Sequence, residues 1–385
     1  MTENANNREL IKDRIRGCMI GGAAGDALGY AVEFKSERGI FEEYGENCIT
    51  AYELDGASGK ALISDDTQMT LFTAAGLLLG DTRFALRGIR ANPGAYVEKA
   101  YRDWLNTQNM TYEEFKAAPE YSVETFTWLS DVPGLYHRRA PGNTCLSALS
   151  SGKSGSPEER INDSKGCGGI MRVAPLALNY GKADIKVLDE EGARIAALTH
   201  GHSLGFIPAA MLTHIISRIV FSACPIPLEN IVSEALDTVG EIFCGDPHLG
   251  ELTQIIRLAV ALSANGESDL ANIRRLGAGW VAEETLAIAV YCALRHRGDF
   301  SAGIIAAVNH GGDRDSTGSV TGNIHGALLG YSAIGEKWKK DLELREVILE
   351  LADDVARGCP VDGYSDHNDP DWMRKYAEKR RPRGM

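Results

Sequence analysis

Two short clusters of acidic and hydroxyl residues, far apart in the sequence, place the strongest constraint on how this 385-residue chain can fold. The first is Ser64-Asp65-Asp66-Thr67, and the second is Asp313-Arg314-Asp315-Ser316-Thr317. Each stands directly before a stretch of helical character, so we expect its carboxylates at a helix N-terminus. Side chains about 250 residues apart can act together only if the fold brings both helix starts into one cavity.

The oxygen donors in these clusters favour hard divalent cations. Mg²⁺ and Mn²⁺ prefer carboxylate, hydroxyl and water ligands, and no soft ligand stands in either cluster. Four aspartates gathered in one cavity would repel one another unless cations neutralise them. The simpler alternative is that each cluster only caps its helix, but capping does not require two acids so close together. We therefore predict a site for two Mg²⁺ or Mn²⁺ ions, which can hold and activate a water between them.

Apolar residues recur at the spacing of an α-helix in several parts of the chain, and the two-residue alternation of strands is scarce. The pattern predicts an all-α protein. Three such stripes are Leu212, Ile215, Ile216 and Ile219; Ile255, Leu258, Ala259 and Leu262; and Leu344, Val347, Ile348, Leu351 and Val355.

Charge and cysteine usage exclude several classes of partner and compartment. The net charge of −13 argues against a nucleic-acid surface, because phosphate binding needs concentrated Lys and Arg. None of the eight cysteines is spaced as C-x-x-C, and several lie in apolar stretches, as free thiols do in reducing compartments. Asp26 and Glu33 interrupt the apolar N-terminal run, which excludes a signal-peptide core. We find no uninterrupted apolar stretch long enough to span a bilayer, and we expect a cytoplasmic protein without a membrane partner.

No segment has the character of a linker between independent domains, because the two acidic clusters must meet across every candidate loop. We expect an N-terminal segment over residues 1–14, one domain over 15–364 and a polar C-terminal tail over 365–385. The composition of the tail is typical of a solvated or frayed terminus. It ends in Lys379, Arg380, Arg381 and Arg383.

A glycine-rich run from Gly17 to Gly29 precedes Glu33 and Phe34. It lacks the lysine of a P-loop, and no strand pattern precedes it as a dinucleotide fold requires. A tightly packed helix of glycine and alanine is therefore favoured over a phosphate-binding loop. The residues of chemical interest in this region are Asp26 and Glu33.

Taken together, the motifs resemble the ADP-ribosylglycohydrolase family, which includes dinitrogenase-reductase-activating glycohydrolase and the vertebrate ADP-ribosylhydrolases. The resemblance rests on Gly25-Asp26-Ala27-Leu28-Gly29 with Glu33-Phe34, on Ser64-Asp65-Asp66-Thr67, and on Gly312-Asp313-Arg314-Asp315-Ser316. Supporting matches follow the family's order from about residue 15 to residue 335. They are Arg139-Ala140-Pro141-Gly142, Gly166-Cys167-Gly168-Gly169-Ile170-Met171-Arg172, Thr199-His200, and Gly279-Trp280 with Glu283-Glu284.

The resemblance implies a compact, single-domain orthogonal bundle of helices with two Mg²⁺ or Mn²⁺ ions in a central cleft. Glu33 corresponds to a mobile acid near the scissile bond, and Glu33, Asp65 and Asp315 are the candidates for the carboxylate that takes a proton from the reacting water. The loop Gly166-Cys167-Gly168-Gly169 is implied to wrap ADP-ribose, with His200 near the same ligand. The implied metal ligands are Ser64, Asp65, Asp66, Asp313, Asp315 and Ser316.

Four positions stand out against the family's pattern. Serine stands at Ser64 and Ser316, where many relatives have threonine, and this keeps the oxygen donor. Cys167 stands where relatives often have asparagine, which removes an amide hydrogen-bonding group. Arg314, between two implied ligands, would either reach a phosphate of the substrate or neutralise the neighbouring acids.

The implied activity is metal-dependent hydrolysis of the glycosidic bond between ADP-ribose and an acceptor, with an ADP-ribosylated arginine on a protein as the expected substrate and ADP-ribose as product. Such an enzyme reverses mono-ADP-ribosylation. Two alternatives stay open: a dimetal phosphoesterase, and an immunity protein that binds and blocks an ADP-ribosyltransferase toxin. The loop from Gly166 to Arg172 and the order of the motifs disfavour the first, and the complete set of acidic ligands disfavours binding alone.

Overall fold

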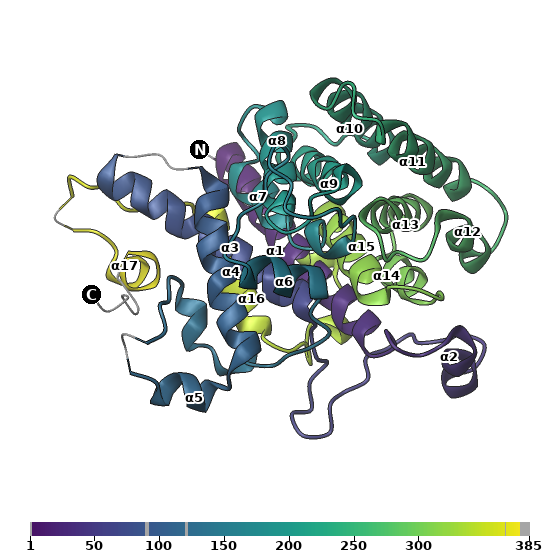
Figure 1. Cartoon of the computed structure of the whole chain (residues 1–385). Coiled ribbons are helices and arrows are strands. Elements are labelled where there is room, and N and C mark those ends of the chain that lie inside the picture. Colours follow the sequence, from purple (N-terminus) through teal and green to yellow (C-terminus); the bar gives the residue numbers. More distant parts are fainter. Residues whose placement is uncertain (1, 89–91, 120–121, 366, 378–385) are drawn as a thin grey trace.

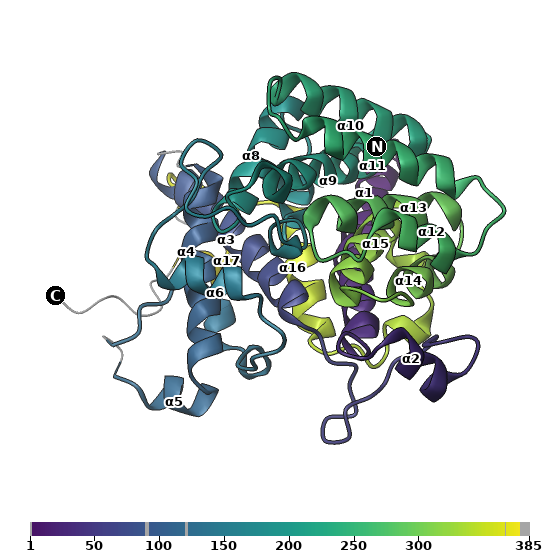
Figure 2. The ribbon, with the colours of Figure 1, turned by 45° about the vertical axis from the view of Figure 1, so that its right-hand side comes forward.

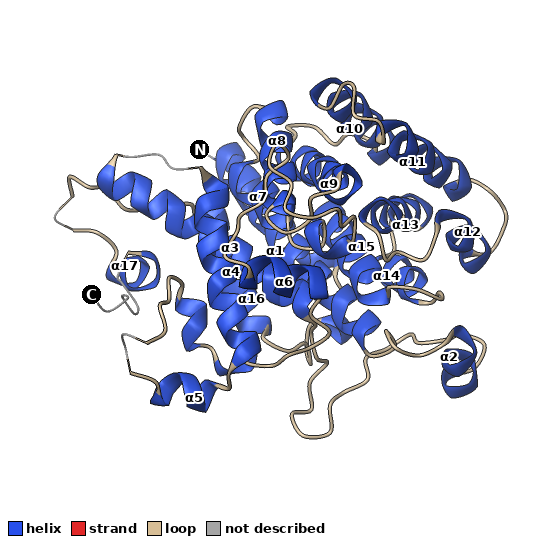
Figure 3. Cartoon of the chain, viewed as in Figure 1, coloured by secondary structure: helices blue, strands red, loops and turns tan. Residues whose placement is uncertain are grey.

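The computed structural model describes residues 2–88, 92–119, 122–365 and 367–377, and Figure 3 shows helices joined by loops. No strand occurs among these residues, where only two isolated bridges, Ala61–Leu342 and Gly166–Val281, pair extended segments. The all-α prediction is confirmed. The α-helices are α1 (Thr2–Tyr30), α2 (Glu37–Tyr44), α3 (Asp65–Arg87), α4 (Pro93–Asn109), α5 (Tyr112–Ala117), α6 (Asn143–Ser150), α7 (Ala174–Tyr180), α8 (Ile185–Ala197), α9 (Ser203–Phe221), α10 (Leu228–Ile242), α11 (Leu249–Ser263), α12 (Asp269–Leu276), α13 (Ala282–Arg295), α14 (Phe300–Val308), α15 (Arg314–Leu329), α16 (Arg345–Arg357) and α17 (Pro370–Tyr376).

Helices α1 and α15 lie side by side at the centre of the fold and run in opposite directions (Figure 1). Their contact is lined by glycines spaced four residues apart, which we call the glycine seam: Gly17, Gly21 and Gly25 on α1 face Gly326, Gly322 and Gly318 on α15. A Cβ added at Gly322 would lie 1.9 Å from the carbonyl oxygen of Gly21, so no larger residue fits without parting the helices. The seam explains the glycine-rich run and joins the C-terminal half of α1 to α15 along most of the length of α15.

The remaining helices surround this central pair. Figures 1 and 2 place α3, α4 and α6 on one side and α10 to α13 on the other, with α2 at the edge of the molecule. The three apolar stripes expected from the sequence lie in α9, α11 and α16, with Leu344 as the residue before α16. The core is therefore continuous from one side of the central pair to the other.

Helix α9 is long and apolar enough to cross a membrane by length and composition alone, with a mean hydropathy of 1.6 over the relevant window, although His214 and Arg218 interrupt its apolar residues. In the structure 89% of that window is buried inside the fold, as in the core helix of a globular domain. This helix is therefore weak evidence for a membrane span.

Both ends of the described chain pack against the body of the protein. Residues 2–14 form the first half of α1, where Asp13 accepts hydrogen bonds from the backbone and side chain of Ser332. Within the segment expected to be a frayed tail, α17 buries Trp372, whose Nε1 donates to Thr82 Oγ1 at 2.9 Å. That expectation is wrong for α17, because its aromatic residues pack against α3. Lys379, Arg380, Arg381 and Arg383 lie outside the described residues, and the domain boundaries at 15 and 364 stay predictions.

Candidate dimetal site

Both acidic clusters lie at helix N-termini, as the sequence predicts. Ser64 is the residue before α3, and its Oγ accepts a hydrogen bond from the backbone N–H of Asp66 at 3.2 Å. Asp313 holds the same position before α15, and its Oδ1 accepts from the N–H of Ser316 at 3.2 Å. The capping explanation is thus correct for these two residues, but it does not account for the gathering of Asp65, Asp66 and Asp315 beside them.

The two helix N-termini meet in the folded chain. One carboxylate oxygen each from Asp65, Asp66 and Asp315 lies within 4.8 Å of the other two, and all three side chains are buried. Ser316 Oγ donates to Asp66 Oδ1 at 3.3 Å across the gap between the clusters. Asp66 Oδ2 is buried, and it has no hydrogen-bond partner in the part of the chain that the structure describes. An unpartnered buried carboxylate oxygen beside two more carboxylates is a set of donors that fits Mg²⁺ or Mn²⁺.

The acids of this site carry strongly raised pKa values. Burial is the main cause and the proximity of Asp315 the next, and together they lift the pKa of Asp65, Asp66 and Asp313 well above the usual range. The same two causes raise the pKa of Glu33 to about 9. Burial and mutual repulsion thus favour the protonated form of these acids, so protons and cations compete for the same oxygens.

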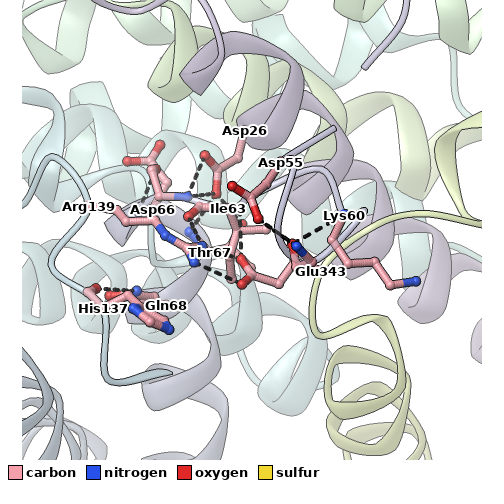
Figure 4. Close-up of polar contacts among 12 residues, drawn as sticks. Asp26, Asp55, Lys60, Ile63, Asp66, Thr67, Gln68, His137, Arg139 and Glu343 are labelled. Atoms are coloured by element: carbon pink, nitrogen blue, oxygen red, sulfur yellow. Dashed lines mark hydrogen bonds and ion pairs between the residues drawn. The ribbon is translucent and has the colours of Figure 1, made fainter. Parts of the chain in front are cut away.

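Asp26 and an ion pair hold the N-terminus of α3 in place (Figure 4). Both carboxylate oxygens of Asp26 accept from the backbone N–H of Ser64 at 3.1 Å, and Oδ2 also accepts from Thr67. The guanidinium of Arg139 forms an ion pair with Glu343 through both of its terminal nitrogens. It also donates a hydrogen bond to the backbone carbonyl of Ile63. The backbone carbonyl of Arg139 accepts a hydrogen bond from the N–H of Asp65. The segment that carries the first acidic cluster is therefore fixed from α1 and from the chain before α16.

Each member of this ion pair precedes a strained residue. Ala140 and Leu344, directly after Arg139 and Glu343, adopt positive φ angles of 51° and 52°, which non-glycine residues rarely do. Such conformations cost about 1–3 kcal/mol and persist where the surroundings determine them. The Arg139–Glu343 ion pair is part of those surroundings. We infer that the strained backbone here is kept because it holds the two charged side chains in position.

Glu33 lies in the turn after α1, where burial raises its pKa and Asp315 and Asp65 are close enough to raise it further. Its side chain is partly buried, and its buried Oε2 has no hydrogen-bond partner among the described residues. The role that the resemblance implies for Glu33 stays a prediction. A carboxyl with a raised pKa and one unpartnered oxygen beside the candidate metal ligands is suited to exchange a proton with a reacting group.

The glycine loop borders the same site. Cys167 begins a short 3₁₀ turn (Cys167–Gly169), and its Sγ donates to Asp313 Oδ2 at 2.8 Å. The thiol therefore contacts a candidate metal ligand. Gly166 is held by a bridge to Val281, and the N–H of Cys167 donates to the carbonyl of Trp280.

His200 is a neutral hydrogen-bonding group next to the glycine loop. Its Nε2 lies 3.4 Å from the place that a Cβ on Gly166 would take and 3.3 Å from the corresponding place on Gly168. Its Nδ1 lies 2.8 Å from Thr199 Oγ1, which accepts a hydrogen bond from buried Arg172 at 2.6 Å. Burial, and then the positive charge of Arg172, lower the pKa of His200 to about 3. A nearby cation favours the lone pair on Nδ1, which leaves Nε2–H as a donor toward the loop.

Arg314 does not contact the acidic site in the way the sequence analysis expected. Its guanidinium is buried and donates to four backbone carbonyls, those of His310, Val32, Glu33 and Lys35, at 2.6 to 3.0 Å. Because it is committed to these carbonyls, the geometry gives no support to the expected contact with a substrate phosphate.

The sequence analysis missed the residues that support the site. Arg139 and Arg172 belong to the supporting motifs, but nothing in the sequence assigned them a contact. Glu343 carries no motif at all. Asp26 stood out in the sequence as a residue of chemical interest within the glycine-rich run, and the structure shows it buried against the first acidic cluster.

Comparisons with known proteins agree with this geometry. A sequence model of the family described as ADP-ribosylglycohydrolase matches residues 7–364. ADP-ribosylhydrolase ARH3 of Danio rerio is 25% identical over 90% of this chain and 90% of its own length. ADP-ribosyl-[dinitrogen reductase] glycohydrolase of Rhodospirillum rubrum is 24% identical over 87% of this chain and 92% of its own. A solved structure described as an "ADP-ribosylglycohydrolase-related protein complex" matches 91% of this chain and 99% of its own, with 25% identity and a TM-score of 0.61.

Proposed function

The chain belongs to the ADP-ribosylglycohydrolase family, and from this premise we propose that it is a metal-dependent hydrolase that removes ADP-ribose from an arginine side chain of a modified protein. The observation that carries the proposal is the meeting of Asp65, Asp66 and Asp315 from two distant helix N-termini. The same reaction would release free ADP-ribose. The eight free cysteines support the cytoplasm as the place where it works.

The proposed metal ligands are the oxygens of the two acidic clusters: Ser64, Asp65, Asp66, Asp313, Asp315 and Ser316. When bound there, divalent cations would orient ribose hydroxyls and lower the pKa of a bound water. The bond that breaks joins C1″ of the ribose to the acceptor, through an oxocarbenium-like transition state. Glu33 Oε2, which has no partner in the site, is the atom placed to exchange a proton with the water or the leaving group.

Two other functions compete with this proposal, and the assay must separate them. A dimetal phosphoesterase would use the same acids but release inorganic phosphate from a nucleotide. An immunity protein would bind an ADP-ribosyltransferase and protect against it even after the acids are removed. The family match over residues 7–364 favours the glycosidic reaction over both.

We expect the purified protein to release ADP-ribose from an ADP-ribosyl-arginine protein in the presence of Mg²⁺ or Mn²⁺ and to lose this activity on exhaustive chelation. The repulsion among Asp65, Asp66 and Asp315 requires cations before the site can hold a substrate. Product analysis by chromatography, with an ADP-ribosyl-serine protein tested in parallel, checks the reaction and the acceptor. Full hydrolysis after chelation, or phosphate as the product, would contradict the proposal.

The same chelation should lower the melting temperature more at pH 8 than at pH 5.5. The raised pKa values mean that the folded, metal-free protein holds protons that the unfolded chain releases above about pH 4. Its stability therefore falls as the pH rises, through a window that extends to the pKa of Glu33 at about 9. Bound cations take the place of those protons, so the metal-bound protein should not lose this stability as the pH rises. An equal effect of chelation at both pH values would show that the acids do not bind the metal.

His200 should act through its Nε2–H. In His200→Gln the amide nitrogen can take the place of Nε2, whereas in His200→Asn it takes the place of Nδ1. We expect the asparagine variant to bind ADP-ribose about three- to tenfold more weakly, the value of one neutral hydrogen bond, and the glutamine variant to stay close to the parent protein. Calorimetric titration with ADP-ribose in saturating Mg²⁺ measures both. Equal affinities in all three proteins would show that Nε2 does not face the ligand.

A further inference from the structure

Arg314 occupies an unusual place between the two acids of the second cluster. Its side chain is only 1% exposed, although arginine is rarely buried to this extent without a charged partner. No carboxylate is hydrogen-bonded to it among the described residues. Its donors go instead to backbone oxygens: Nε to His310 at 2.6 Å, and Nη1 to Val32 at 2.6 Å, Glu33 at 3.0 Å and Lys35 at 2.6 Å.

Three of those carbonyls belong to the turn that follows α1. They lie just beyond Tyr30, where α1 ends, and a cation near a helix C-terminus is favoured by the partial negative charge there. Local hydrogen bonds of the turn are few: Val32 N–H to Gly29, Glu33 N–H to Tyr30 at 3.3 Å, and Lys35 N–H to Val32. The Arg314 guanidinium therefore provides most of the long-range anchoring of residues 32–35.

The backbones of the two elements are also in contact. A Cβ on Gly29 would lie 2.2 Å from the carbonyl oxygen of Arg314, so the last turn of α1 touches the first turn of α15. The other polar ties of this region are exposed ion pairs, such as Arg274 with Glu37, and pairs of that kind contribute little. In addition to this backbone contact, three hydrogen bonds from Arg314 join the Glu33 turn to the helix start that carries Asp313 and Asp315.

We propose that Arg314 is a positioning residue that fixes the turn bearing Glu33 to the N-terminus of α15 and so holds the Glu33 carboxyl at a set distance from the acidic site. We call this link between Arg314 and the carbonyls of residues 32–35 the clamp. The effect of the clamp on catalysis rests on the proposed function, but the existence of the clamp does not. Displacing a reacting group by about 1 Å can cost a hundredfold in rate, which is the effect that such a clamp prevents.

The test compares Arg314→Met, Arg314→Lys and the control Arg274→Met, which removes a surface ion pair of the neighbouring α2. We expect Arg314→Met to speed amide hydrogen exchange at residues 32–36 at least tenfold and to lower kcat tenfold or more, with KM changed less than threefold. Mn²⁺ affinity, measured by calorimetry, should change less than threefold, because Asp313 and Asp315 stay on α15. For Arg314→Lys we expect an exchange rate and a kcat between those of Arg314→Met and those of the parent protein. Arg274→Met should match the parent protein in both.

Two results would overturn the proposal: unchanged exchange at residues 32–36 in Arg314→Met, or faster exchange with an unchanged kcat. If Arg314→Met does not fold, Arg314→Lys carries the same comparison, because it keeps the charge and loses the fork of donors. Hydrogen exchange needs no substrate. A parent protein without activity on any ADP-ribosylated substrate would therefore refute the proposed function while the clamp is still judged by exchange.

Discussion

Asp315→Ala should reduce the release of ADP-ribose at least about a hundredfold while leaving the fold intact. Asp315 contributes an oxygen to the buried carboxylate group with Asp65 and Asp66, and its proximity raises the pKa of every other acid in the site. Substitutions beyond the direct ligands of a metal typically cost ten- to a hundredfold, so loss of a ligand should cost more. Steady-state kinetics together with metal content by calorimetry check the prediction.

Two further variants separate loss of chemistry from loss of structure. Asp315→Asn keeps the shape of the side chain but not its charge, so it should be as inactive as the alanine variant. It should also leave the metal-free protein at least as stable, because one of the repelling carboxylates is gone. Asp237→Ala, on the exposed face of α10, should behave as the parent protein. Near-normal turnover with normal metal content in Asp315→Ala would refute the role assigned to Asp315.

Gly322→Ala should destabilise the protein by about 3 kcal/mol or more, although alanine is the better helix former. The added Cβ would lie 1.9 Å from the carbonyl oxygen of Gly21, and a backbone atom cannot move aside as a side chain does. Overpacking of a core commonly costs about 1–3 kcal/mol, and here the cost should lie at or above that range. Denaturant unfolding measures the change, and metal affinity should fall with it because α15 shifts relative to α3.

Gly240→Ala is the matched control. Gly240 lies inside α10, and nothing lies within 4 Å of the place that its Cβ would take. Alanine in the interior of a helix is favoured over glycine by about 0.5–1 kcal/mol, so this variant should gain stability. Equal effects of the two substitutions would show that the seam does not need glycine.

The sequence predicted the candidate site where polar residues stand out from their surroundings. Asp65 and Asp315 could be found because pairs of acids at helix starts exceed what capping needs, and the fold confirms that they meet. The glycine spacing of four residues predicted close helix packing, but it did not say which helix packs against α1. Spacing within one segment carries no information about a partner almost 300 residues away.

The contacts that sequence could not predict are those in which one partner is the backbone or stands in no motif. Arg314 was expected at a phosphate or among acids, yet it binds carbonyls of a turn about 280 residues earlier, and carbonyls are present at every position. Glu343 stands in no motif, and its pairing with Arg139 depends on the register of two extended segments at Ala61 and Leu342. Such roles become visible only when the packing is known.

The glycine seam also determines when the protein can become active during its synthesis. Gly25 and Gly318 touch in the fold but are separated by about 290 residues of chain. At about 5–20 residues per second, a ribosome needs roughly 15 to 60 s to make the chain between them. Throughout that time α1 exposes a bare glycine face without a partner, and the acids of α3 lack those of α15. The nascent protein therefore has no site until its last quarter is made, and a chain that stops early leaves α1 unpaired.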